Sequence, residues 1–93
     1  MSKPRNGASV DGNQKEIIDA LKQIGCSVVA IGTPVDLLVG YRKHNFLIEV
    51  KRPGEKVRTD AQRQFLASWK GQCRVCSSVE EACRLVTYAY KPS

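Results

Sequence analysis

Two carboxylates and a lysine lie near the ends of two apolar runs in this chain. Asp36 stands at the start of one run, and Glu49 and Lys51 stand at the end of the next, with the polar segment 41–44 between the runs. This order predicts a β-hairpin with a loop over residues 41–44. Such a hairpin sets Asp36 opposite Glu49.

Directly opposed side chains in a hairpin have Cβ atoms about 4.5–5.5 Å apart, and like charges placed there destabilise the sheet unless a cation compensates them. Strand alternation places Lys51 on the same face as Glu49. Two converging carboxylates suit Mg²⁺ or Mn²⁺, because these hard ions prefer oxygen ligands. With an ammonium group beside the ion, the combination fits phosphodiester hydrolysis, in which a metal polarises the phosphate and activates water.

A plainer interpretation makes Asp36 a turn residue after Pro34 and makes Glu49 and Lys51 solvated neighbours on an amphipathic strand. For an isolated Glu-x-Lys, the plainer interpretation is the stronger one. Here Asp36 lies inside an apolar run, where a carboxylate without a partner is costly. The run therefore favours the metal site.

Apolar spacing and turn residues predict the elements that would position these groups. A polar, flexible tail over residues 1–12 precedes a single domain over 13–93. The expected order is α-β-β-β-α-β-α, and the fold class is α/β with a mixed sheet flanked by helices. The helices are expected over 13–24, from a cap at Thr59 or Asp60 to Gly71, and from Ser78 through Val86; the strands over 26–31, 35–40, 45–51 and 72–76.

Three segments carry a resemblance to a known nuclease family. In order along the chain, the segments 33–39, 46–51 and 59–65 resemble the motifs of the PD-(D/E)XK superfamily, and most closely those of the virus-type replication-repair nuclease (VRR-NUC) domain. The resemblance covers about residues 13–86 and implies a restriction-endonuclease-like core. Val35 separates Pro34 from Asp36, so the literal Pro-Asp dipeptide of the superfamily is absent.

The resemblance implies a role for each matching residue. The implied metal ligands, for Mg²⁺ (or Mn²⁺), are Asp36, Glu49 and the main-chain carbonyl of Val50. The implied catalytic residues are Asp36, Glu49, Lys51, Glu16 and Gln62, with Lys51 acting on the attacking water, Glu16 assisting from the first helix and Gln62 lining the site from the second. The implied substrate is DNA, branched or in a four-way junction, cut by a homodimer.

Glu16 and Gln62 each have a second interpretation from the sequence. The spacings Asn13-x-x-Glu16 and Thr59-x-x-Gln62 both match a capping box, in which the later side chain closes a helix N-terminus. The capping and the catalytic interpretations are both open for each residue. His44, the only histidine, falls in the predicted hairpin loop and has no ligand-spaced partner.

The chain carries a formal net charge of +6, which favours an anionic partner. The residues expected to contact DNA phosphates are Arg42, Lys43, Arg52, Lys56, Arg58 and Arg63. The alternative is an ordinary solvated basic surface. No amphipathic basic helix, membrane-length apolar run or signal-like N-terminal segment is present in the sequence, so we expect a cytoplasmic protein of a bacterial or phage-infected cell and no membrane partner.

The four cysteines and three of the aromatic residues are expected to be structural. One C-x-x-C pair raises the possibility of a small zinc-stabilised binding domain, but strand alternation puts Cys73 and Cys76 on opposite faces. We therefore expect reduced core thiols. The spacing of Phe65, Trp69 and Tyr88 likewise predicts core packing rather than base stacking.

The sequence predicts a metal-dependent DNA endonuclease, with structure-specific cleavage of the kind that Holliday-junction resolvases perform. Two alternatives stay open: a nuclease that prefers flaps, nicks or ends, and a catalytically silent DNA-binding module. With 93 residues and 42% hydrophobic content the core is modest, so a symmetric dimer would add buried surface.

Overall fold

The structure is a computed structural model that describes residues 12–55 and 59–90. The elements are α1 (Gly12–Gln23), β1 (Ser27–Ala30), β2 (Leu37–Tyr41), β3 (His44–Val50), α2 (Asp60–Ser68), β4 (Cys73–Cys76) and α3 (Val79–Tyr90). The predicted order is confirmed. The predicted tail lies outside the described residues, except Gly12, with which α1 begins. Within residues 12–55 and 59–90, no helix has the length and apolar character needed to cross a bilayer.

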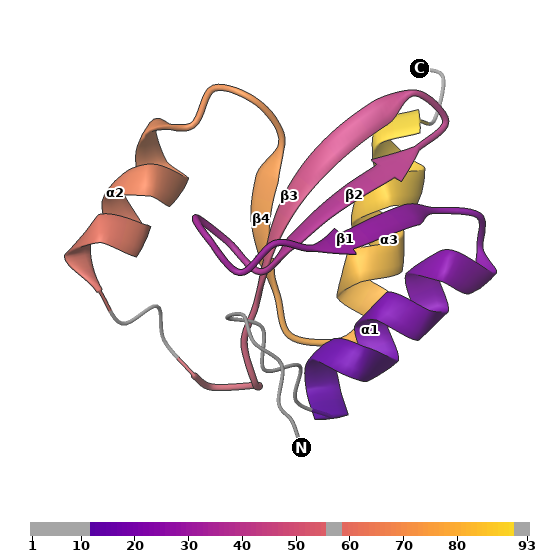
Figure 1. Cartoon of the computed structure of the whole chain (residues 1–93), viewed down its shortest axis with the longest axis horizontal. Coiled ribbons are helices and arrows are strands. Elements are labelled where there is room, and N and C mark those ends of the chain that lie inside the picture. Colours follow the sequence, from indigo (N-terminus) through magenta and orange to yellow (C-terminus); the bar gives the residue numbers. More distant parts are fainter. Residues whose placement is uncertain (1–11, 56–58, 91–93) are drawn as a thin grey trace.

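The four strands form one mixed sheet in the order β1-β2-β3-β4. The β1–β2 and β2–β3 pairs are antiparallel, and the β3–β4 pair is parallel. Figure 1 shows α1 and α3 together on one side of this sheet and α2 apart from them on the other side. The chain reaches α2 after β3 and returns to the sheet at β4, which is the connection that a parallel pair requires.

The β2–β3 hairpin has the predicted register and a shorter turn. Gly40 pairs with Asn45, but Tyr41 and His44 also pair, so the turn is Arg42-Lys43 rather than 41–44. Both turn residues have positive φ, 50° and 73°, as a tight two-residue hairpin turn requires. The sequence does not reveal this turn because glycine or asparagine normally fills such positions.

The core lies between the sheet and the α1–α3 pair. Strand alternation directs Phe46 and Ile48 of β3 into this layer, where they are 1% and 0% exposed. The helical spacing of α1 brings Ile17 and Leu21 to the same layer, and both are 0% exposed. The rest of the buried cluster is Cys26, Leu37, Val39, Cys76, Ala82 and Val86.

The opposite face of the sheet is covered only in part, by α2. Thr59 caps this helix, with its Oγ1 accepting a hydrogen bond from the Gln62 N–H at 3.1 Å, and no residue of α2 is buried. The core-packing prediction is wrong for Trp69 and Tyr88, which are 48% and 67% exposed. Helical spacing identifies the apolar side of a helix but not how much neighbouring structure covers it.

Candidate metal and active site

Glu49 is a buried carboxylate on the sheet face that α2 partly covers. It lies between the core residues Ile48 and Val50 along β3, so alternation turns its side chain away from the main core. It is nevertheless only 3% exposed. A charge buried to this degree requires partners, and two of them are the residues that the sequence predicts at this site.

The two oxygens of the Glu49 carboxylate have different surroundings. Oε2 accepts a hydrogen bond from Gln62 Nε2 at 3.0 Å and lies 3.2 Å from Lys51 Nζ. Oε1 is buried and has no hydrogen-bond partner among the described residues. The described residues therefore provide donors to one oxygen and none to the other.

Gln62 thus reaches into the site, and the capping-box interpretation of its side chain is wrong. Only the Gln62 backbone N–H takes part in the helix cap, while the side chain spans from α2 to β3. Lys51 keeps its ammonium group at the same carboxylate, with its side chain 11% exposed. A site built from β3 and α2 is the result.

Burial raises the pKa of the Glu49 carboxyl group, and the nearby Asp36 carboxylate raises it further. The ammonium group of Lys51 and the amide of Gln62 lower this pKa, and the net change is upward. Lys51 and Gln62 therefore offset only part of the rise in this pKa that burial and the Asp36 charge cause. An additional positive charge at this position would relieve both.

Asp36 is held just before β2, at the end of the hairpin where Glu49 lies. Its Oδ2 accepts a hydrogen bond from the Val50 N–H at 2.8 Å, and its backbone carbonyl accepts from Ile31 N–H at 2.9 Å and Gly32 N–H at 3.3 Å. The prediction that Asp36 pairs within the strand is wrong, because β2 begins at Leu37. Leu37 pairs with Ile48, so the same register extended by one residue sets Asp36 opposite Glu49. The N–H and C=O of a strand residue point the same way, so the Val50 carbonyl also faces the Asp36 side.

The oxygens of Asp36, Glu49 and Val50 are too few to surround a metal ion by themselves. Within residues 12–55 and 59–90, no group of three or more His, Cys, Asp and Glu side chains could hold a metal. Mg²⁺ is commonly bound through one or two carboxylates together with waters and substrate phosphates. Asp36, Glu49 and the Val50 carbonyl could supply such oxygens, and Glu49 Oε1 has no partner among the described residues.

Helix α1 meets the site through Asn13 and not through Glu16. The Asn13 side-chain N–H donates to the Lys51 carbonyl at 3.2 Å, and Gln14 is 7% exposed. Glu16 is exposed, with no hydrogen bond or ion pair to the described part of the chain. The capping-box interpretation of Asn13 and Glu16 is not supported, because Asn13 lies within α1 and not at its N-cap.

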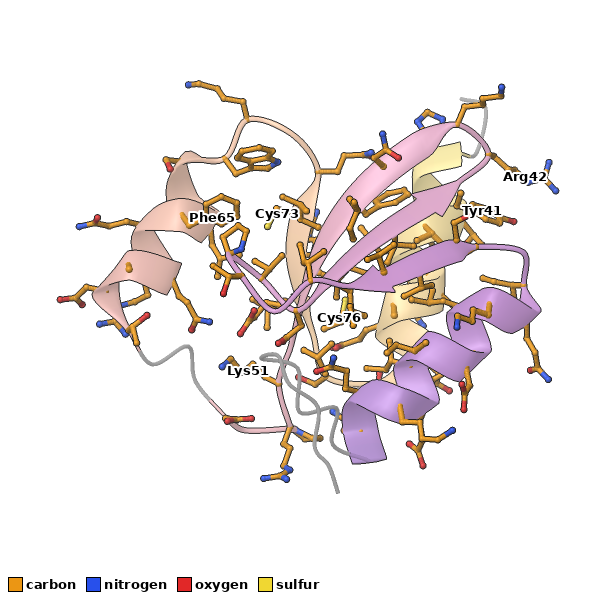
Figure 2. The ribbon with its side chains drawn as sticks, in the orientation of Figure 1. Tyr41, Arg42, Lys51, Phe65, Cys73 and Cys76 are labelled. Carbon is orange, nitrogen blue, oxygen red and sulfur yellow. The ribbon has the colours of Figure 1, made fainter. Side chains whose placement is uncertain are left out.

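The basic residues expected to bind DNA are spread over different parts of the structure. Arg42 follows Asp36 by six positions along β2, which corresponds to about 20 Å at 3.3 Å per residue. Figure 2 shows Arg42 and Lys51 at opposite ends of the hairpin. The guanidinium of Arg42 lies over the Tyr41 ring, 5.5 Å from its centroid.

The other basic residues lie nearer the β3–α2 connection. The Arg52 N–H donates to Glu55 Oε1 at 2.8 Å, and the Arg63 guanidinium pairs with Asp60 on the exposed side of α2. Lys56 and Arg58 lie outside the described residues. Arg52 therefore stands next to Lys51, whereas Arg42 and its neighbour Lys43 are remote from the carboxylates.

The cysteines are free thiols and give no support to a zinc site. Burial raises the pKa of Cys26 and of Cys76 to about 11, whereas zinc is bound by the thiolate. Cys76 is 2% exposed in the core. Burial and the Glu49 charge raise the pKa of Cys73. Cys73 pairs with Leu47 and Cys76 with Val50, so the two cysteines lie on opposite faces of the sheet, as predicted.

No protein-family model, curated protein or solved structure matches this chain. The resemblance to the nuclease superfamily therefore rests on the sequence motifs. The geometry of Asp36, Glu49, Lys51 and Gln62 is the independent basis on which a function can be argued.

Proposed function

We propose that this protein is a Mg²⁺- or Mn²⁺-dependent endonuclease that hydrolyses phosphodiester bonds in DNA. The observation that carries the proposal is the divided carboxylate of Glu49. One oxygen has two donors, and the other is buried without a partner. A buried acceptor in that condition costs about 1–3 kcal/mol, and a bound cation would remove the cost.

Asp36, Glu49 and the Val50 carbonyl would hold the ion, which supplies polarisation of the phosphate and activation of a water when bound. The protein itself fixes these ligands before any ion arrives. The Val50 N–H holds the Asp36 carboxylate, and the Gln62 amide holds the Glu49 carboxylate. Groups held in position in this way favour both ion binding and transition-state stabilisation.

Lys51 supplies a fixed positive charge beside the carboxylates. Its ammonium group lies 3.2 Å from Glu49 Oε2, and its main-chain carbonyl is tied to α1 by Asn13. An ammonium held in a mostly buried position stabilises negative charge that develops on the phosphate or on the attacking water. Gln62 acts through Glu49 and is a positioning residue.

The net charge of +6 supports a polyanionic substrate. Branched DNA, and a four-way junction in particular, is proposed from the resemblance to replication-repair nucleases. A homodimer is proposed on the same ground, since a junction has approximate two-fold symmetry and each chain holds one Asp36–Glu49 pair. Preference for flaps, nicks or ends is the competing specificity.

The proposal is tested by cleavage of duplex, nicked, flap and four-way DNA with Mg²⁺, with Mn²⁺ and with EDTA. We expect metal-dependent cleavage by the native chain and its loss in Glu49→Gln and Asp36→Asn. Asparagine is the better replacement for Asp36, because its amide oxygen can still accept from the Val50 N–H. Asp19→Asn, an exposed carboxylate on α1, is the matched control and should cleave normally.

Unchanged cleavage by a folded Glu49→Gln variant would overturn the site. DNA binding without cleavage of any substrate, with either metal, would make the chain a binding module that retains the fold.

A further inference from the structure

A groove of about 360 Å³ opens between α2 and the sheet face that this helix partly covers. Its walls are largely apolar and are formed by Pro34, Leu38, Leu47, Phe65 and Trp69. The rings of Phe65 and Trp69 are stacked, with centroids 5.1 Å apart and planes at 29°. Figure 2 shows Phe65 directed from α2 toward the sheet. The groove is therefore an open, aromatic-walled slot.

The groove and the candidate metal site are neighbours along two elements. On β3, Leu47 precedes Glu49 by two residues and shares its face, which separates them by about 7 Å. On α2, Phe65 follows Gln62 by one helical turn and lies on the same side. A distance of 7 Å is roughly twice the 3.4 Å spacing of nucleotides along one strand of a duplex.

We propose that this groove binds an unpaired nucleobase of the substrate, one or two nucleotides from the phosphate at the Asp36–Glu49 pair. The inference rests on the proposed function and narrows its substrate class to DNA with unpaired nucleotides beside the cut. Bases stack on aromatic side chains without regard to sequence. Trp69 offers such a surface because it is 48% exposed in the free protein.

The surroundings of the groove suit a nucleotide rather than a purely apolar ligand. Asn45 and Gln72 also line the groove. The Gln72 side-chain N–H donates to the Asn45 carbonyl at 2.8 Å, and the amide oxygen of Gln72 and the amide of Asn45 are groups of the kind that bond to base edges. The exposed Lys70 follows Trp69 directly, and Lys51 lies toward the metal site. Of these two lysines, Lys70 is the one with an exposed side chain that could meet a phosphate next to the stacked base.

A base in an intact duplex is excluded from this position by its own pairing. Inserting it would cost a few kcal/mol of unstacking and unpairing. A flap, a bulge or the branch point of a junction presents unpaired or easily opened nucleotides at no such cost. Selectivity for branched DNA then arises from the groove and not from the metal site.

The test uses Trp69 itself as the probe, because it is the only tryptophan in the chain. Its fluorescence is followed while an oligothymidylate is added in EDTA, so that no cleavage occurs. We expect saturable quenching. Labelled oligothymidylate should bind at least about 5-fold more weakly to Trp69→Leu, from the 1–3 kcal/mol range for stacking on an aromatic side chain, and near normally to Trp69→Phe. Tyr88→Leu, an exposed aromatic on α3, is the matched control.

The second readout is the ratio of cleavage rates on flap and intact duplex DNA, which Trp69→Leu should lower toward one. Absence of quenching, or equal binding by Trp69→Leu and the native chain, would overturn the nucleobase site. Trp69 emission that changes with protein concentration alone would assign the groove to an interface between two copies and likewise overturn it. Because the quenching is measured in EDTA, a chain that binds the oligonucleotide but never cleaves would refute the nuclease function and leave the groove assignment standing.

Discussion

Replacing Glu49 by Gln is expected to stabilise the metal-free protein while removing its response to Mg²⁺. The pKa of Glu49 is raised because burial and the Asp36 charge outweigh the help from Lys51 and Gln62. The ionised carboxylate is therefore a net cost at neutral pH, and glutamine resembles the protonated form. The Gln62 hydrogen bond survives, because glutamine retains an acceptor oxygen.

The size of the gain follows from two opposing contributions. Replacing the buried charge by a neutral amide removes part of a desolvation penalty of about 1–3 kcal/mol, although the amide N–H groups then take the place of Oε1, which has no partner among the described residues. The variant also loses the ion pair between Glu49 and Lys51, whose side chain is only 11% exposed, so we take the lower end of that range. One kcal/mol corresponds to a rise in Tm of about 4–8 °C for a domain of 60–100 residues.

The same pKa direction predicts how stability depends on pH. A carboxyl whose folded pKa is raised stabilises the fold below its ordinary pKa of 4.5, and that contribution is lost as pH rises through the folded value. Relative to Glu49→Gln, the native chain should therefore lose stability as pH increases from about 4.5 upward. The difference between the two proteins should be greatest at neutral pH.

Thermal melts in EDTA and in Mg²⁺ provide the assay, with Asp19→Asn as the control for removal of an exposed carboxylate. At a Mg²⁺ concentration 100 times its Kd, the native chain should gain about 2.7 kcal/mol, and Glu49→Gln should gain far less. A Glu49→Gln variant that is less stable than the native chain in EDTA would refute the reasoning from burial. Equal Mg²⁺ stabilisation of both proteins would refute the metal site.

Three further outcomes are expected. Lys51→Met should slow cleavage by about 10²–10³-fold, as removal of one electrostatic donor does, and should leave DNA binding in EDTA nearly unchanged. Lys15→Met, at an exposed lysine, is the control. Equal losses in rate and binding would make Lys51 only a phosphate contact. Neutralising Arg42 and Lys43 should lower the slope of log K against log salt by about 1.8, at about 0.9 per phosphate contact; an unaltered slope would remove the hairpin turn from the interface. Sedimentation with and without four-way DNA should show a dimer, since a 93-residue chain buries limited apolar surface; a monomer that fully cleaves junctions would contradict it.

The hairpin register could be predicted from the sequence because both strands carry a clear apolar pattern. A slip by one residue would have turned Phe46 and Ile48 out of the core. The turn was harder to predict, because Arg42 and Lys43 adopt positive φ without the glycine or asparagine that usually marks such turns. Tyr41 lies under the Arg42 guanidinium, a contact that no local pattern reveals.

The buried polar residue of α1 could have been found from helical spacing. Gln14 precedes Ile17 by three positions and Leu21 by seven, which places it on the buried side of the helix. Glu16 does not share that side, and the structure leaves it exposed. The family motif pointed to Glu16, whereas the amphipathic pattern of this chain predicts that Gln14 is the buried polar residue.

The exposure of Trp69 could not be read from the sequence, because it depends on how α2 sits against the sheet. The helix has an apolar side like α1, and only the tertiary arrangement shows that it buries no residue. The groove beside Phe65 and Trp69 results from this incomplete cover. Apolar spacing describes a single helix, whereas this groove depends on how the helix and the sheet are placed relative to each other.

The light cover of α2 links the order of this helix to the chemistry of the site. Because α2 buries no residue, the hydrogen bond from Gln62 to Glu49 is one of the few contacts described between the helix and the sheet. Ionisation of Glu49 strengthens that bond, since an acceptor that carries charge binds a donor roughly twice as strongly. The form of Glu49 that can bind a cation is thus also the form that holds α2, and with it Phe65 and Trp69, against the sheet.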